Sequence, residues 1–359
     1  DPLPAASSWK ASGEKRKENS GLIGAYSWIA MEFGLAPEGR LAHAATGLGN
    51  DKVLIFGGVG EERDLLNDSW VLTMDADDVT GLWSPLRTDG AGPEPRYAHT
   101  LVTLRDGRIV MFGGITGENR SDETWILCMN ENHTGATWKS VTITGDRPVG
   151  RGLHSAVPLH DGRMLIFGGV AAEKQPLDDV WALALEPETN SGTWTQINTI
   201  SGPPQSRACH SAVKMRAGGH MAVFGGLALS GEKIVALSDT WMLFVDIGAT
   251  TGTWTALQAS GGAPADRGLH SAAMWPSGHM TIFGGFSLDT SNRTLDDTWT
   301  LSLESDVSGT WRPMDTTSAP PSARAWHSMS LLGTKLVVFG GFGGWSADSQ
   351  PFNDTWVLL

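Results

Sequence analysis

Apolar and polar positions alternate along this chain in a pattern that returns with a period of roughly 55 to 60 residues, in the range typical of propellers and solenoids. In one copy, the small and apolar run Ser155-Ala156-Val157 leads through the turn Asp161-Gly162 to a continuously apolar run that ends at Phe167. Two further runs follow, each centred on a tryptophan, Trp181 and Trp194. Alternation favours a half-buried strand, a continuous apolar run favours a strand buried on both faces, and Asp-Gly favours a two-residue hairpin. The pattern therefore predicts units of four short strands, which we call A, B, C and D in chain order.

Four anchors locate the copies: Arg-x-x-His before strand A, Phe-Gly-Gly at the end of strand B, an acid two residues before the strand-C Trp, and a strand-D Trp. The first anchor comprises Arg40, Arg96, Arg151, Arg207, Arg267 and Arg324, with His43, His99, His154, His210, His270 and His327. The strand-C acids are Asp68, Glu123, Asp179, Asp239, Asp297 and Asp354. A residue that recurs in every unit is expected to stabilise the unit, whereas a catalytic site on such a ring is normally built from residues that break the symmetry. We therefore expect each Arg to form a structural ion pair with the acid of its copy, and each His to hydrogen-bond buried backbone beside the Trp.

The last copy ends after Trp356 without a strand D, and a matching piece lies at the other end of the chain. Trp28 precedes Arg40 by about a dozen residues, within one residue of the spacing that separates every other strand-D Trp from its next Arg. An N-terminal strand that completes the last unit closes the ring and removes exposed sheet edges. We therefore predict an all-β, six-bladed propeller over residues 27–359, in which the strand 27–31 completes blade six. Residues 1–26 are predicted to form an irregular N-terminal arm.

These anchors resemble kelch repeats, which form β-propellers, and the resemblance covers about residues 28 to 359. The variant with Arg-x-x-His and Phe-Gly-Gly is similar to the kelch repeats joined to F-box domains in plants. The resemblance implies the fold and little about activity. Kelch proteins include ubiquitin-ligase substrate receptors, cytoskeletal scaffolds, a sialic acid epimerase, nitrile-specifier proteins and galactose oxidase, and a fold does not fix a function.

The enzymatic kelch proteins offer motifs to compare with this sequence. The copper site of galactose oxidase uses two tyrosines, one joined to a cysteine, whereas the tyrosines here, Tyr26 and Tyr97, lie near no candidate cysteine. The iron motif of nitrile-specifier proteins is matched by Asp266 and His270, but Gly262 stands where the motif has Glu. We therefore predict no catalytic residue, no metal site and no cofactor. A sugar epimerase is not excluded by motif.

Composition narrows the range of partners. A formal net charge of −13 opposes nucleic-acid binding, which needs a basic surface. No apolar run approaches the roughly 18 residues of a membrane span, so we expect a soluble chain without membrane insertion. Cys128 and Cys209 belong to different units and are predicted to be separate, buried, free thiols. The sequence starts at Asp1, which leaves the compartment open between cytoplasm and an extracytoplasmic site reached by a removed targeting peptide.

The loops between strands B and C break the symmetry of the repeat. Strand A begins and strand B ends at the same rim, so the B-to-C and D-to-A loops share one face of the predicted ring. The C-to-D loops on the other face resemble one another from copy to copy, so we expect that face to be structural. Variable loops on a rigid scaffold commonly carry recognition. The candidate binding residues on these loops are Arg63, Glu118, Arg120, Lys174, Lys233, Arg293 and Trp345.

Trp345, which follows two glycines in a long loop, is the best single candidate for a binding hot spot, since Trp contributes strongly to interface energetics. The alternative is that Trp345 folds back over blade six. We predict a non-enzymatic scaffold, or a subunit of a larger assembly, that binds a protein or peptide. The alternative is a carbohydrate-handling enzyme or lectin that binds a sugar or other small ligand in the central channel. An adaptor role in ubiquitin ligation is a third possibility.

Overall fold

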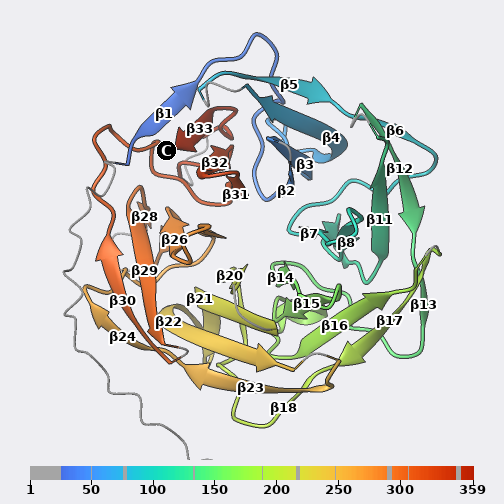
Figure 1. Ribbon diagram of the computed structural model, residues 1–359, viewed down its shortest axis with the longest axis vertical. Coiled ribbons are helices and arrows are strands. Elements are labelled where there is room, and N and C mark those ends of the chain that lie inside the picture. The colour runs from blue at the N-terminus through green and yellow to red at the C-terminus, as the bar shows by residue number, and fades with distance from the viewer. Residues whose placement is uncertain are drawn as a thin grey trace, which may run out of the picture.

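The computed structural model describes residues 26–49, 51–75, 79–131, 134–187, 189–215, 219–246, 248–288, 293–305, 307–344 and 349–359. In this part of the chain the strands form six antiparallel blades of four strands around a central opening, with strand A innermost and strand D outermost (Figure 1). The six-bladed propeller predicted from the sequence is confirmed. The predicted arm, apart from Tyr26, lies outside the described residues.

Each blade follows the predicted order of strands A to D. Blade one contains β2 (Ala44–Gly49), β3 (Lys52–Val59), β4 (Leu65–Met74) and β5 (Gly81–Pro85). Blade two contains β7 (Thr100–Thr103), β8 (Ile109–Phe112), β11 (Thr124–Met129) and β12 (Gly135–Ser140). Blade three contains β14 (Ser155–Pro158), β15 (Met164–Phe167), β16 (Val180–Leu185) and β17 (Ser191–Gln196).

The second half of the ring repeats this order. Blade four contains β20 (Ser211–Lys214), β21 (Gly219–Ser230), β22 (Lys233–Val245) and β23 (Thr251–Ala256), with β19 (Arg207–Ala208) paired to β21. Blade five contains β25 (Ser271–Met274), β26 (Met280–Phe283), β29 (Thr298–Ser305) and β30 (Ser308–Pro313). Blade six contains β31 (Ser328–Leu332), β32 (Lys335–Phe339) and β33 (Thr355–Leu358), and takes its strand D from the N-terminus as β1 (Trp28–Met31).

The ring closes where the two ends of the chain meet. The N-terminal β1 pairs antiparallel with β33, with Trp28 opposite Leu358, and the two lie side by side in Figure 1. In blade two, Trp138 lies opposite Leu127 in the same register. Trp28 also rests on Phe283 of the preceding blade, with ring centroids 5.0 Å apart. The register and the aromatic contact therefore make Trp28 equivalent to the strand-D Trp of the other blades.

A fifth, parallel strand joins neighbouring blades at the rim, a feature that the sequence pattern does not predict. After leaving strand D of one blade, the chain pairs in parallel with strand D of the next. These linking strands are β6 (Arg87–Asp89), β13 (Thr142–Thr144), β18 (Asn198–Thr199) and β24 (Gln258–Gly261). Tyr26 makes the corresponding parallel bridge with Thr316 beside blade six. The rim is therefore tied together by backbone as well as by side chains.

The hydrophobic core lies between adjacent blades. Phe167 of blade three is fully buried, and Trp254 of blade four covers it with ring centroids 4.8 Å apart. Each full burial of such a side chain contributes about 1.5 to 3 kcal/mol relative to exposure. Gly168 and Gly169 follow Phe167 with φ values of 63° and 95°, and a Cβ at Gly169 would lie 2.7 Å from the carbonyl oxygen of Gly152. Only glycine fits this turn, which explains the Gly-Gly of the repeat.

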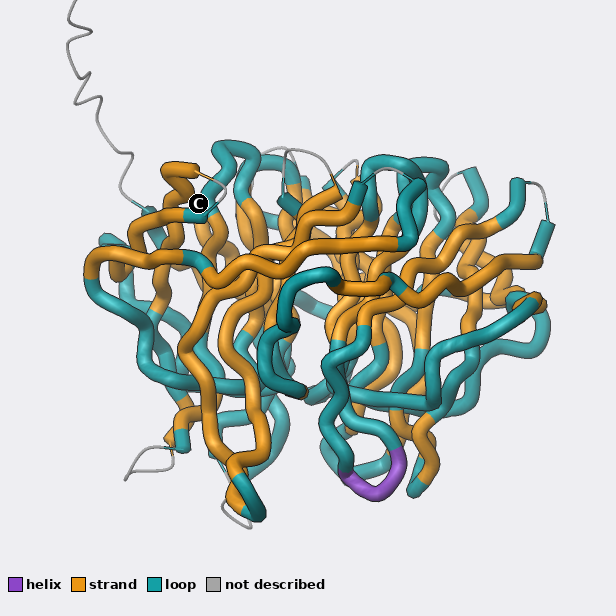
Figure 2. The backbone as a smooth tube through the Cα atoms, turned by 90° about the horizontal axis from the view of Figure 1, so that it is seen from below, coloured by secondary structure: helices purple, strands orange, loops and turns teal. Residues whose placement is uncertain are grey.

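The B-to-C loops project from one face of the ring, below the blades in Figure 2. Blade two extends there as the hairpin β9 (Ile115–Thr116) and β10 (Asn119–Arg120), and blade five as β27 (Phe286–Ser287) and β28 (Arg293–Thr294). The 3₁₀ turn η1 (Ala172–Lys174), drawn in purple, occupies the same position in blade three. Within the described ranges, no helix is long and apolar enough to cross a membrane.

Candidate functional site

The six repeated arginines are used inside the blades. Arg151 has a side chain that is 0% exposed, and its guanidinium binds both carboxylate oxygens of Asp179, at 2.6 and 2.8 Å, and donates to the carbonyl oxygen of Gly168. The indole N–H of Trp181 donates to the same carboxylate. Every blade has the equivalent Arg–acid pair. The ion pairs expected from the sequence are therefore present, and these arginines are not available to a ligand.

The six repeated histidines form a second internal ring. Besides the expected backbone interaction, which acts on His99, His210 and His327, five of the six share a hydrogen bond with a hydroxyl of the preceding blade. The Nε2 atom of His210 shares a 2.8 Å hydrogen bond with the hydroxyl of Ser155 in the preceding blade. The equivalent pairs are His43 with Ser328, His154 with Thr100, His270 with Ser211, and His327 with Ser271. Burial, and then the charge of the neighbouring Arg, lowers the pKa of all six imidazoles, to about 3 for His43 and His210. The histidines are therefore neutral structural groups and do not supply acid–base chemistry at neutral pH.

His99 lacks a hydroxyl partner because Ala44 occupies the position that carries Ser or Thr in the other blades. We predict that Ala44→Ser supplies the missing hydrogen bond to Nε2 and raises the free energy of unfolding by about 0.5 to 1.5 kcal/mol. The reciprocal variant Ser155→Ala, which removes the partner of His210, should lower it by a similar amount or more. Urea unfolding at neutral pH measures both. If Ala44→Ser lowers the free energy of unfolding, as Ser155→Ala is expected to do, then a hydroxyl at position 44 is not a hydrogen-bond partner of His99.

The residue before each repeated His lines the mouth of the central channel. These residues all have left-handed backbone, with φ between 54° and 62°, and they are Ala42, Ala98, Leu153, Cys209, Leu269 and Trp326. The N–H of each donates to the carbonyl oxygen of its equivalent in the preceding blade, and Ala42 completes the circle by donating to Trp326. Left-handed backbone is unfavourable for residues other than glycine. The cyclic hydrogen bonding therefore holds a strained position whose side chain differs from blade to blade.

The two cysteines are free and separate, as expected, but neither is buried in the core. Cys209 is half-buried at the channel mouth, not inside strand A, and burial raises its thiol pKa to about 12. Cys128 is half-buried on β11. Among the residues that the structure describes, no cluster of His, Cys, Asp and Glu is placed to hold a metal ion.

Inward from this mouth, the channel itself is a space of about 360 Å³ lined by strand A of every blade. Lys214 is the one charged side chain among the described residues that line it, and burial followed by the charge of Arg105 lowers its pKa. The hydroxyls of Thr46 and Thr103 bond to each other at 2.9 Å, and Thr103 also donates to the carbonyl oxygen of Gly47. These threonine hydroxyls of the wall are therefore used between blades one and two.

A larger pocket, of about 690 Å³, opens beside the channel mouth on the face of the B-to-C loops. Its apolar wall comes from Leu41, Tyr97, Trp326 and Phe342, all half-buried, together with Val59 and Pro351. Trp326 lines both this pocket and the channel mouth. Blades six, one and two contribute residues to this pocket. Blade six lies next to blade one because the ring is closed, and a 2.9 Å hydrogen bond from the Gly341 N–H to the carbonyl oxygen of Arg40 joins these two blades.

Of the predicted binding residues, Arg63 is the one among the described residues that lines this pocket. Glu118 and Arg120 lie on the β9/β10 hairpin, where the guanidinium of Arg120 donates to the carbonyl oxygen of Glu118. Lys174 in η1, Lys233 at the start of β22 and Arg293 at the start of β28 are exposed on three other blades. Trp345 lies outside the described residues. The six predicted residues that the structure describes thus share a face, but the structure does not gather them into one site.

The sequence analysis missed the aromatic wall of the pocket. Tyr97 and Trp326 occupy the two unspecified positions of Arg-x-x-His, where other blades carry smaller residues such as Ala208 and Ala98. This departure from the repeat is visible in the sequence once those two positions are compared across blades. That both residues line one pocket depends on the neighbouring blades and on ring closure.

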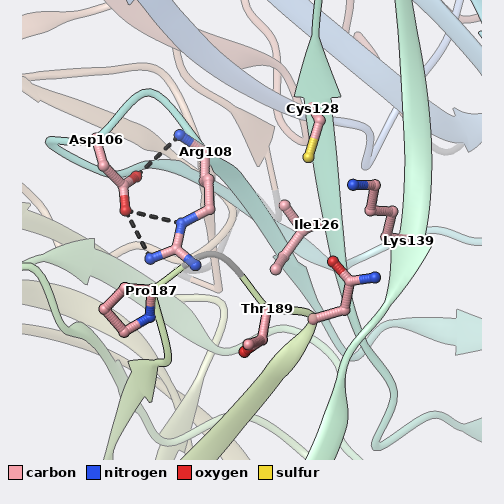
Figure 3. Close-up of a pocket in the computed structure, with 8 residues that line it drawn as sticks. Asp106, Arg108, Ile126, Cys128, Lys139, Pro187 and Thr189 are labelled. Carbon is pink, nitrogen blue, oxygen red and sulfur yellow. Dashed lines mark hydrogen bonds and ion pairs between the residues drawn. The ribbon is translucent and has the colours of Figure 1, made fainter.

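The opposite face also carries a pocket, of about 530 Å³, between blades two and three (Figure 3). Arg108 faces Asp106 there, with a 2.6 Å ion pair, and donates to the carbonyl oxygen of Glu186 in blade three. Arg163 repeats this arrangement with Asp161 and with the carbonyl oxygen of Ala249 in blade four. The polar groups of this face therefore connect adjacent blades, which agrees with the structural role expected for it.

The comparison with protein families matches the KLHDC2/KLHL20/DRC7 Kelch-repeats domain to residues 25–226 and 132–341. The two overlapping matches span most of the propeller. The chain belongs to the kelch-repeat family. A solved structure with the description "Structure of YjhT" superposes with a TM-score of 0.64, covering 90% of this kelch chain and 95% of that chain, at 18% sequence identity. At this identity the likeness supports the fold alone.

Curated relatives of this kelch propeller are longer proteins. An F-box/kelch-repeat protein of Arabidopsis thaliana is 28% identical over 320 residues, which cover 81% of this chain and 64% of the relative. Adagio-like protein 1 of Oryza sativa subsp. japonica is 29% identical over 89% of this chain and 50% of its own length. Human Host cell factor 2 is 28% identical over 74% of this chain and 33% of its own length. The kelch chain therefore spans less than two thirds of the length of these relatives.

Proposed function

We propose that this kelch propeller is a non-enzymatic interaction module that binds a protein or peptide segment on the face of the B-to-C and D-to-A loops, as a scaffold or as part of a larger assembly. The observation that carries the proposal is the pocket of about 690 Å³ walled by Tyr97, Trp326 and Phe342. Concave apolar pockets with aromatic walls are preferred anchor sites for ligands and partner side chains. The F-box/kelch-repeat relative, which by its name joins an F-box to kelch repeats, supports a role beside other domains.

The repeat supplies a substitution that should remove the anchor site without disturbing the fold. Trp326 has left-handed backbone, and its equivalents in blades one and two are Ala42 and Ala98, so alanine is already compatible with that conformation. Tyr97 is likewise replaced by Ala208 in blade four. A protein with both Tyr97→Ala and Trp326→Ala should therefore keep its thermal stability and lose most of its partner affinity. Truncating two aromatic anchors is expected to weaken binding by about thirtyfold or more.

The measurement is a selection of random peptides displayed on phage against the full chain, followed by dissociation constants for the enriched peptides. Lys139→Ala is the control, because Lys139 is exposed in the pocket of the opposite face and should leave affinity unchanged. Selected peptides that bind the wild type and the double variant equally well would reject the pocket as the docking site.

A further inference from the structure

The pocket has a carboxylate rim beside its apolar wall. A Cβ at Gly60, which lines the pocket, would lie 2.7 Å from Oδ1 of Asp64 and 3.2 Å from Oε2 of Glu38, so both carboxylates flank this glycine. Glu61 also lines the pocket, and its Oε1 accepts a 3.0 Å hydrogen bond from the backbone N–H of Gly39. The three acids come from two separate segments, the D-to-A connection and the B-to-C loop of blade one, which place them at one edge of the pocket.

The charge of this edge is unbalanced. Glu38, Glu61, Glu62 and Asp64 are exposed, and Arg63 is the cation within the same loop, so four carboxylates and one guanidinium leave a local formal charge of −3. Arg40 also faces Glu38, but its guanidinium is engaged by Asp68 at 2.6 Å. Burial, followed by the charges of Asp64, Asp68 and Glu61, raises the pKa of Glu38, and Arg40 opposes this rise only in part. The carboxylates therefore repel one another, and a cation placed among them relieves that repulsion.

Resting on the docking role proposed above, we infer that the pocket takes a large apolar side chain of a partner segment, and that Glu38, Glu61 and Asp64 bind a Lys or Arg next to it in that segment. The apolar wall and the acidic edge meet at Val59, Gly60 and Glu61, so the two side chains of the partner have to be close neighbours. An acidic segment would add like charge to this edge and is disfavoured. The net charge of −13 of the whole chain favours the approach of a cationic partner in the same way.

The carboxylates can be neutralised with little change in shape. The variant Glu38→Gln, Glu61→Gln, Asp64→Asn keeps an oxygen at each position, including an acceptor for the Gly39 N–H. Glu118→Gln is the matched control, because it removes one exposed carboxylate from the same face but from the hairpin of blade two. Charges at that range are screened at physiological salt. Melting curves of all variants show whether each one is folded.

The test uses the same displayed library of random peptides against the full chain, and synthetic copies of the enriched peptides. We expect enriched peptides to carry a large apolar residue within two positions of Lys or Arg. The triple variant should bind them roughly tenfold more weakly, since an exposed charge pair is worth a few-fold in affinity and three are removed. Raising the salt should weaken binding to the wild type and have little effect on the triple variant, and Glu118→Gln should bind within about twofold of the wild type.

The possible failures separate the two proposals. Peptides that need Tyr97 and Trp326 but show no preference for Lys or Arg, or that prefer acids, overturn this inference and leave the docking role in place. Equal binding of basic peptides by the wild type and the folded triple variant overturns it as well. A library that yields no peptide dependent on Tyr97 and Trp326 overturns the docking role and this inference together.

Discussion

Acidification from about pH 7 to about pH 4.5 is expected to unfold this propeller, because the ring of six buried histidines cannot take up protons while it is folded. Each imidazole has its pKa lowered by burial and by the adjacent Arg, to about 3 for His43 and His210. In the unfolded chain the same groups have pKa values of about 6.5. Below that value the unfolded state binds more protons than the folded state, so the free energy of unfolding falls as the pH falls.

The size of the effect follows from the number of histidines. One group whose folded-state pKa is lowered contributes a slope of about 1.4 kcal/mol per pH unit between its unfolded and folded pKa values, so six contribute about 8 kcal/mol per pH unit. A typical domain is stable by about 5 to 15 kcal/mol, so the transition should fall roughly one to two pH units below 6.5. The strand-C carboxylates Asp68, Asp239, Asp297 and Asp354, whose pKa values are lowered in the fold, contribute little in this window. Burial by itself would raise the pKa of Asp68. The hydrogen bond and the charge of Arg40 outweigh burial and hold this pKa below its ordinary value, which is near 4.

Urea unfolding at closely spaced pH values between about 7 and 5 measures the slope. His99→Leu is the informative variant, because His99 has no hydroxyl partner, and removing it takes away one titrating group. If this variant folds, its slope should be smaller by about one sixth, whatever its stability at neutral pH. A free energy of unfolding that stays constant from about pH 7 to 5 would show that the histidines are not held neutral by the fold.

The features predicted correctly from the sequence are those in which both partners belong to the repeat. Arg151 and Asp179 occupy fixed positions of one copy, so their pairing follows from the pattern alone, and Trp28 was placed by its spacing from Arg40. The turn Asp161-Gly162 was predicted less well. Gly162 has the expected positive φ of 90°, but the strands close through a bond from the Leu159 N–H to the carbonyl oxygen of Arg163, which makes a longer loop than the two-residue hairpin.

The features that the sequence did not reveal depend on contacts between blades. The hydroxyl partner of His210 is Ser155, which lies 55 residues earlier in the chain, and its geometry follows from the angle between adjacent blades. The linking strand β13 is short and carries no strong apolar alternation, and it forms because strand D of the next blade presents a free edge. The aromatic pocket combines Tyr97 of blade two with Trp326 of blade six, which ring closure brings to either side of blade one, and no local pattern encodes that arrangement.

Replacing Trp28 by Ala is expected to open the ring at blade six. Trp28 is 3% exposed, and the hydroxyl of Ser318 bonds to its backbone N–H and carbonyl oxygen at 2.7 Å each. Truncating a buried Trp to Ala costs about 3 to 5 kcal/mol. Within the blade β1 pairs with β33, and its other edge is held by short contacts of Tyr26 and Trp28 with residues 316–318. The loss should therefore appear first as local detachment of β1, which leaves the edge of β33 exposed and prone to pair with another molecule.

Trp254 is a matched control for this closure. It is also 3% exposed, it covers Phe167 as Trp28 covers Phe283, and Ser201 bonds to its backbone N–H and carbonyl oxygen as Ser318 does to those of Trp28. Neither indole N–H has a hydrogen-bond partner among the described residues.

Hydrogen exchange should separate the two variants. In Trp28→Ala, the amides of residues 28–31 and of Thr355–Leu358 should exchange roughly 100- to 4,000-fold faster, since the expected loss of about 3 to 5 kcal/mol gives a factor of ten for each 1.4 kcal/mol. In Trp254→Ala, the same segments should change only with global stability, because β23 lies in another blade and follows its partner β22 directly in the chain, whereas β1 joins β33 from the other end of the chain. Unchanged exchange in Thr355–Leu358 of the Trp28→Ala protein would mean that β1 does not hold blade six closed.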